Sequence, residues 1–227
     1  MISLSGIDDT VYGVIVPRID DYRQALDLGR KALSGRNPDI LASYSGAVIH
    51  RDREKKVSLS LNFLNLGTII SWPDLEFSYI NSHEEVSIQK QILLLHYLSG
   101  AWSSSGAART GEWIAFQDVP DGKFYLDAFR KRAKNPLVKA LGPHPGLLIK
   151  IAREAYDADP FDYGDFAVLV KALPRVPVAL ILWKGDEEFQ PEGNVLFDRS
   201  ISDIFSAEDI AWLAGMVVYP LIGMVGE

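Results

Sequence analysis

The fold is decided first by the stretch VSLSLNF at residues 57–63, in which apolar and polar side chains alternate strictly. This period of two is typical of a strand with one face in the core and one in water, an arrangement found mainly in antiparallel sheets. The segments at 45–50 and 66–72 have strand-like composition as well, and a charged turn at 51–55 separates the first of them from residues 57–63. We therefore predict an antiparallel meander that ends at Pro73.

Outward from this meander, the pattern alternates between helices and a second group of strands. Period-3.6 patterning and capping residues predict helices at 20–33, 82–98, 123–134 and 147–156, and one that begins at the Ser206 cap. Asn135-Pro136 is expected to break the helix at 123–134. Branched and aromatic residues predict further strands at 112–119, 166–173, 178–183 and 195–197. The sequence thus predicts one α+β domain over residues 1–227, with a largely antiparallel sheet, an N-terminal helical extension at 1–40, a core at 41–225 and a buried C-terminal helix.

Composition excludes several classes of function. The 227 residues contain no cysteine, which excludes disulfides, thiolate metal sites, a Cys nucleophile and iron–sulfur ligation by this chain. With 23 Lys and Arg against 30 Asp and Glu, the net charge of −7 argues against non-specific nucleic-acid binding. The N-terminus lacks the features of a secretory signal, and the longest uncharged run, Ile210–Gly226, is shorter than the roughly 20 residues of a membrane-spanning helix. We predict a cytoplasmic protein that binds neither membrane nor nucleic acid.

The densest carboxylate cluster follows a predicted strand. Asp186, Glu187 and Glu188 stand together, and Asp198 lies further along the chain. Carboxylates hold Mg²⁺ or Ca²⁺ through oxygen ligands, or act as general acids and bases, so these four residues are candidate metal ligands, with Asp186, Glu188 and Asp198 also candidate catalytic groups. The alternative interpretation is a solvated turn, in which Asp198 caps backbone groups or pairs with Arg199.

Two cationic segments are candidate anion sites. The loop Gly100–Gly111 carries Arg109 and has the glycine spacing of a phosphate loop, but Glu112 follows where that motif requires lysine. Residues 123–139 include Arg130 and Arg132 among six Lys and Arg against a single acidic residue, Asp127. Such a patch binds a phosphate or an acidic partner, or is simply the wet face of a helix.

One histidine stands out. His96 lies within the apolar helix LLLHYL at residues 93–98, where it is either a hydrogen-bonded core residue or a candidate catalytic base. The chain contains no His-Glu-x-x-His, no Gly-x-Ser-x-Gly and no Gly-x-Gly-x-x-Gly, so the zinc-protease, hydrolase and dinucleotide templates find no support.

Several segments carry a resemblance to a known family. They are LPRVP at 173–177, LWKGDEEF at 182–189, NVLFDRSI at 194–201, QILLLHYL at 91–98 and GEWIAF at 111–116. Over roughly residues 40–220 the chain resembles an uncharacterised family, found largely in anaerobic bacteria and archaea and catalogued as a domain of unknown function. Some relatives join this domain to a Cys-rich iron–sulfur segment reminiscent of corrinoid iron–sulfur proteins, which implies a setting in redox or one-carbon metabolism. Because this chain has no cysteine, such a role requires a partner protein.

Three functions remain open from the sequence. The first, which we favour because no catalytic template is complete, is a binding or accessory module for an anionic small molecule or a partner protein, with Arg109, Arg130, Arg132, Trp183 and Arg199 as ligand-binding residues. The second is a metal-assisted enzyme that uses the carboxylates Asp186, Glu187, Glu188 and Asp198 with His96 as base. The third is an interaction protein that buries its C-terminal helix in an oligomer. The sequence identifies no cofactor.

Overall fold

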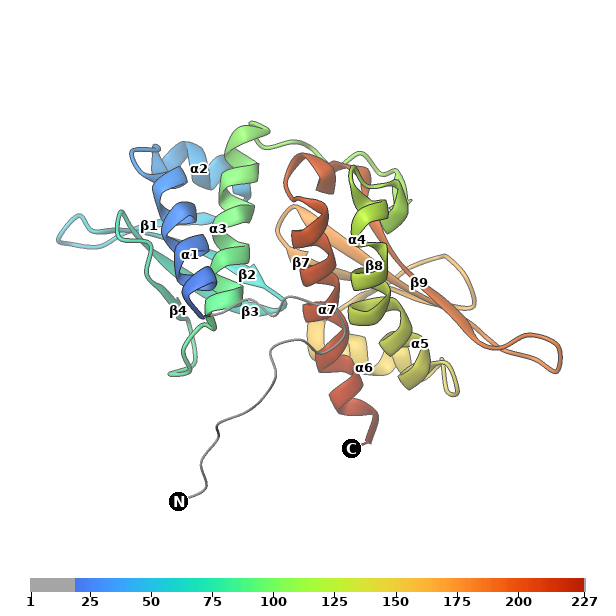
Figure 1. The fold of residues 1–227 in the computed structure, drawn as a ribbon. Helices are drawn as coiled ribbons and strands as arrows, with labels where there is room; N and C mark the ends of the chain where they lie inside the picture. The colour runs from blue at the N-terminus through green and yellow to red at the C-terminus, as the bar shows by residue number, and fades with distance from the viewer. Residues whose placement is uncertain (1–18, 227) are drawn as a thin grey trace, which may run out of the picture.

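A computed structural model of the protein describes residues 19–226, so the first 18 residues of the predicted N-terminal extension lie outside the described residues (Figure 1). Two antiparallel sheets stand side by side, and helices cover one face of each. We call helices α1 to α3 with strands β1 to β4 the N-terminal lobe, and all later elements the C-terminal lobe. The α+β class is confirmed, with two sheets rather than one.

The N-terminal sheet contains the predicted meander, but it does not end at Pro73, because a fourth strand follows that residue. Its strands pair in chain order: β1 (Val48–Arg51), β2 (Val57–Phe63), β3 (Leu66–Trp72) and β4 (Phe77–Tyr79). The alternation in β2 is confirmed, because Leu59, Leu61 and Phe63 are buried whereas Asn62 on the other face is exposed.

Helices α1 (Ile19–Leu33), α2 (Pro38–Ser45) and α3 (Ile88–Ser103) cover this sheet. The helix α2 was not predicted, although its cap is local: the Asn37 side chain accepts hydrogen bonds from the backbone N–H groups of Asp39 and Ile40. The predicted start of α3 at Ser82 is wrong. The Ser82 hydroxyl accepts from the N–H of Glu84 and closes a turn, and the helix begins six residues later.

The C-terminal sheet has the order β5-β9-β8-β7-β6 and is antiparallel throughout. Its strands are β5 (Trp113–Ala115), β6 (Asp159–Pro160), β7 (Phe166–Leu173), β8 (Val176–Trp183) and β9 (Glu192–Asp198). The helices α4 (Gly122–Phe129), α5 (Asn135–Leu141), α6 (Leu147–Tyr156) and α7 (Ala207–Gly223) cover one face. Short 3₁₀ turns occupy Phe116–Asp118, Arg199–Asp203 and Met224–Gly226.

The predicted break at Asn135-Pro136 is wrong, because a π-helical segment, Arg130–Lys134, joins α4 to α5. There the N–H of Asn135 donates to the carbonyl of Arg130, five residues back. Proline has no N–H to give to an ordinary helical ladder, and the wider π turn accommodates this residue without ending the helix.

The C-terminal helix is buried, as predicted. Ser206 and Asp209 form a complete capping box at its start, and its interior residues, including Ile210, Leu213 and Val217, have no exposed surface. No helix among residues 19–226 is long and apolar enough to span a bilayer.

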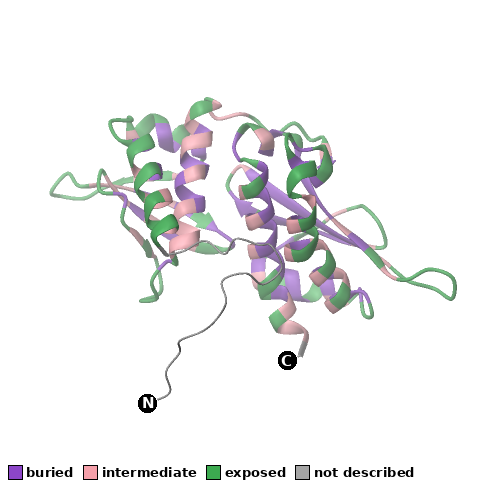
Figure 2. Ribbon diagram, viewed as in Figure 1, coloured by how far each residue is buried: buried purple, intermediate pink, exposed green. Residues whose placement is uncertain are grey.

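One hydrophobic core runs through both lobes (Figure 2). The lobes are also tied by backbone contacts: the N–H of Leu64 donates to the Ala172 carbonyl at 2.9 Å, and α3 approaches the turn before α7 at Gly100. A Cβ at Gly100 would lie 2.0 Å from the Ile204 carbonyl oxygen, so only glycine allows this approach.

Candidate functional site

The predicted carboxylate cluster is divided between the two ends of β9. Asp186, Glu187 and Glu188 lie in the exposed loop at the tip of the β8–β9 hairpin, which projects away from the helices (Figure 1). The Asp186 carboxylate accepts 2.8 Å hydrogen bonds from the N–H groups of Phe189 and Glu188, and these bonds lower its pKa. This geometry is that of a capped turn.

Asp198 lies at the opposite end of β9 and has 1% of its surface exposed. It accepts hydrogen bonds from the backbone N–H groups of Thr110, Gly111 and Ser200 and from the hydroxyls of Thr110 and Ser200. Burial on its own would raise the pKa of Asp198, but these hydrogen bonds prevail and lower it to about 2. Asp198 therefore anchors the loop before β5 to the end of β9.

The structure thus does not bring the four predicted metal ligands together. Among residues 19–226, no group of three or more His, Asp or Glu side chains is placed to hold a metal ion. Asp186 and Asp198 instead accept hydrogen bonds from donors in their own neighbourhoods, as the alternative interpretation of a solvated turn and a cap expects.

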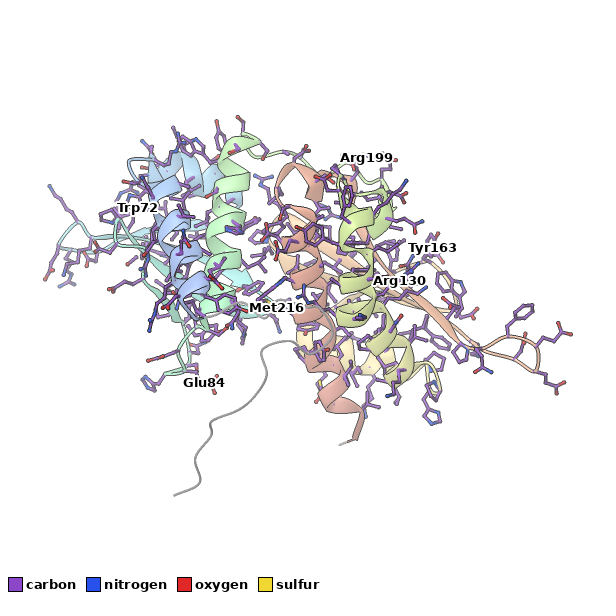
Figure 3. All side chains as sticks on the ribbon, in the orientation of Figure 1. Trp72, Glu84, Arg130, Tyr163, Arg199 and Met216 are labelled. Carbon is purple, nitrogen blue, oxygen red and sulfur yellow. The ribbon has the colours of Figure 1, made fainter. Side chains whose placement is uncertain are left out.

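The five predicted ligand-binding residues also lie apart. Arg199 forms a bidentate pair with Glu112, with an Nη2–Oε1 distance of 2.6 Å, and Arg130 is exposed on the π segment. Trp183 belongs to a row of aromatic rings on the sheet face that the described helices leave open, where it contacts Tyr163. Figure 3 shows Arg130, Tyr163 and Arg199 on the C-terminal lobe, away from the junction, whereas Met216 lies on the side of α7 that faces α3. Arg109 lines a separate pocket, and only Arg132 enters the cleft described next.

A large cavity lies between the lobes, where α7 and α6 face the start of α3. It has a volume of about 760 Å³, within the range of small-molecule sites. Its walls are mainly apolar and include Leu64, Leu66, Ala155, Tyr156, Trp212, Met216 and Pro220. We call this cavity the interlobe cleft.

Two cations enter the interlobe cleft, one from each lobe. The Arg132 guanidinium lies 5.6 Å from the centre of the Trp212 ring, and the Lys90 ammonium donates to the Tyr79 hydroxyl at 3.0 Å. Both side chains are half-buried, and no ion pair joins either one to a carboxylate within residues 19–226. The aromatic neighbours hold the charges in place without neutralising them.

A smaller cavity of about 240 Å³ continues the cleft along α3, and the two cavities share Gln89 and Trp212. His96 lines it, and its Nδ1 lies 2.8 Å from Oδ1 of Asp209 on α7. The hydrogen bond to Asp209 raises the pKa of His96, against burial, which lowers it. His96 is therefore neither a plain core residue nor a metal ligand, but one half of a His–Asp pair that bridges the lobes.

Sequence reasoning missed Lys90, Trp212 and Met216, which line the cleft together with Arg132. It also missed Tyr79, whose hydroxyl accepts a hydrogen bond from Lys90. No motif links residues 79, 90, 132 and 212, because their proximity depends on the packing of α3 against α7. One local signal was available: the basic run at 130–134 precedes Asn135-Pro136, and π segments of this kind occur frequently at functional sites.

Comparison with known proteins agrees with the resemblance noted in the sequence. Residues 37–219 match the model of a family described as a domain of unknown function (DUF3786). The chain belongs to this family. The match extends from the cap of α2 into α7 and so includes Lys90, His96, Arg132 and Asp209. No curated protein and no solved structure matches the chain.

Proposed function

We propose that this DUF3786 protein binds an organic anion in the interlobe cleft: a small molecule with a flat apolar body and at least one carboxylate or phosphate group. The observation that carries this proposal is the pair of unneutralised, half-buried cations, Lys90 and Arg132, on opposite walls of a mainly apolar cavity of about 760 Å³.

The charge balance supports an anion. In a chain with a net charge of −7, two half-buried cations without carboxylate partners in the described chain make the cleft locally positive, and an anionic ligand would neutralise it. A ligand anion between Lys90 and Arg132 gains charge-assisted hydrogen bonds in a partly dry site, where they are stronger than in water.

The apolar walls support a ligand body rather than a simple ion. Trp212 and Tyr156 present aromatic surface to the cleft, and Met216 adds a flexible thioether that adapts to an irregular shape. The Tyr156 hydroxyl already donates to the Val217 carbonyl at 2.8 Å, so its ring is fixed before any ligand arrives. Such preorganisation lowers the entropic cost of binding.

The test is a thermal-shift and calorimetric screen of aromatic carboxylates, phosphate esters, folates, corrinoids and tetrapyrroles. A ligand at about 100 times its Kd adds about 2.7 kcal/mol, which raises Tm by about 5–10 °C for a chain of this size. Arg132→Ala and Lys90→Ala should each weaken binding at least tenfold, whereas the matched variant Arg130→Ala, on the same helix but outside the cleft, should bind normally. Equal affinity in Arg132→Ala and Arg130→Ala would refute the assignment.

A second candidate function, acid–base catalysis on the bound anion, is favoured by one observation. The Asp209 carboxylate accepts a hydrogen bond from His96 Nδ1–H, so in the neutral imidazole Nε2 is the basic nitrogen. A metal-assisted reaction at Asp186, Glu188 and Asp198 has less support, because those carboxylates lie at opposite ends of β9. Turnover of a ligand found in the screen, lost in His96→Gln with binding intact, would favour catalysis over simple binding.

The setting that we propose follows from the resemblance. A cytoplasmic accessory module in the metabolism of anaerobes would receive its anion from, or present it to, an iron–sulfur or corrinoid partner protein. Pull-down with tagged protein from an anaerobic lysate, compared with Arg132→Ala, tests whether the cleft takes part in that contact.

A further inference from the structure

A third cavity, of about 390 Å³, lies at the lobe junction on the sheet side rather than the helix side. On β2 the buried residues Leu59, Leu61 and Phe63 face the helices, so Ser60 and Asn62 point to the opposite face, where this cavity lies. Its other wall comes from β7, β8 and the loop 104–112, through Lys171, Pro174, Pro177 and Arg109. The cavity is separate from the interlobe cleft and shares no lining residue with it.

Two cations converge at this cavity. Arg109 makes no ion pair with any residue of the described chain, and Lys171 pairs with Asp159 at 2.8 Å. The hydrogen bond to Asp159 raises the pKa of Lys171, the charge of Asp157 adds to that rise, and the charge of Arg109 opposes it. Arg109 has no carboxylate partner among the described residues, so an anion bound in this cavity would supply one.

The backbone next to Arg109 is held in place by the buried carboxylate of Asp198. That carboxylate binds the N–H groups of the next two residues, Thr110 and Gly111, at 3.0 and 2.7 Å. At the start of the same loop, Gly106 has a φ of 73° and packs against Tyr44, where a Cβ would lie 2.9 Å from the Tyr44 Cα. The backbone of the loop is thus fixed on both sides of Arg109, which places this exposed side chain at the cavity.

The floor of the cavity supplies neutral polar groups. The Ser60 hydroxyl lies 2.7 Å from Nε2 of His50, and Asn62 is exposed two residues further along the same strand face. Val48 and Ile80, both exposed apolar residues, form the rim together with Pro174.

We propose that this cavity binds the phosphate group of a phosphomonoester, with Arg109 and Lys171 as the anion-binding cations, Ser60 and Asn62 as polar ligands and the apolar rim against the organic part. A phosphate dianion has three terminal oxygens, and the planar fork of arginine with a lysine ammonium and neutral donors matches that number better than it matches a carboxylate. Asp198 is a positioning residue, because it acts only through the loop that carries Arg109. This proposal does not rest on the function proposed for the interlobe cleft.

The experiment is isothermal titration of the full chain with inorganic phosphate and with phenyl phosphate at constant ionic strength. We expect both to bind, and phenyl phosphate to bind more tightly because its ring reaches the apolar rim. Arg109→Ala and Lys171→Ala should each weaken binding at least tenfold, and Arg109→Lys should restore part of it. Arg153→Ala and Lys150→Ala, exposed on α6, are the matched controls.

Several outcomes would overturn the proposal. Absence of phosphate binding, or binding that Arg109→Ala leaves unchanged, would exclude this site. Binding that is lost in Arg132→Ala but kept in Arg109→Ala would place phosphate in the interlobe cleft instead. Because Arg109 is exposed, Arg109→Ala should keep the Tm of the parent, so loss of binding will not reflect unfolding.

Discussion

Replacement of Asp198 tests how the junction between the loop 104–112 and β9 is built. Four of its five hydrogen bonds end on Oδ1, from the N–H and hydroxyl of both Thr110 and Ser200, and the fifth, from Gly111 N–H, ends on Oδ2 at 2.7 Å. Asp198→Ala removes every acceptor and leaves two buried donors of Ser200 unsatisfied. At about 1–3 kcal/mol for each such donor, we expect a loss of about 2–6 kcal/mol.

Asp198→Asn removes the negative charge of the side chain but nearly keeps its shape. An asparagine keeps one oxygen for the four Oδ1 donors but presents an NH₂ group to the N–H of Gly111, so part of the network survives. The lowered pKa of about 2, against 3.8 for an unperturbed Asp, corresponds to about 2 kcal/mol of stabilisation by the charged form. We expect Asp198→Asn to cost about that much at pH 7.

The sign of the pH dependence follows from the same shift. A carboxyl group whose pKa is lowered by folding stabilises the protein above the unfolded value, and this contribution is lost as the pH falls through the folded value. The difference in unfolding free energy between the parent and Asp198→Asn should therefore shrink from about pH 4 downward. Urea denaturation at pH 7, 5, 4 and 3 measures it, with the exposed Asp203→Asn as control. A difference below about 0.5 kcal/mol at pH 7, or one that does not change with pH, would refute the reasoning.

Three further predictions concern the lobes and their junction. The hydrogen bond to Asp209 raises the pKa of His96, so His96 stabilises the fold fully below about pH 6.5 and loses this contribution as the pH rises through its folded pKa. An NMR titration should show that the pKa of His96 lies above about 6.5 in the parent and falls in Asp209→Asn. A pKa of His96 that is the same in both proteins would contradict the pairing. Gly100→Ala places a Cβ against the Ile204 carbonyl and should lower the unfolding free energy by about 2 kcal/mol or more, measured by urea denaturation. A neutral result would mean that α3 does not approach the turn before α7 so closely. Asn37→Ala removes the α2 cap and should cost about 1 kcal/mol, whereas Asn37→Asp should restore it in the same assay.

Much of the secondary structure follows from local patterns. The bounds of β2, β3, β7 and α6 were predicted residue by residue, because alternation and helical spacing report which side chains face the core. The cap at Ser206 was likewise predicted, since its hydrogen bond joins residues three apart, although the reciprocal bond from Asp209 was not. The errors at Ser82 and Asn135-Pro136 have a common cause. Each has a second local solution, a turn in the first case and a π segment in the second, and only packing selects between them.

Candidate sites were predicted less completely than the elements that carry them. His96, Arg132 and Arg109 were each named, but as isolated residues, and the role of Asp198 was left open between metal ligand and cap. The cavities show which of them lie together and with what: Arg132 with Lys90 and Trp212, His96 with Asp209, Arg109 with Lys171. Lys90 and Lys171 carry no sequence signal of their own.

The sequence by itself thus determined the α+β class, the buried C-terminal helix, the absence of thiol chemistry and the family, because composition and short-range periodicity reflect local burial and hydrogen bonding. Tertiary structure alone decided that there are two sheets, that a cleft separates α3 from α7, and that cations far apart in the chain share a cavity. The physical reason is that these pairings depend on how amphipathic faces pack. That packing arises from contacts between residues as distant as His96 and Asp209, which no local pattern encodes.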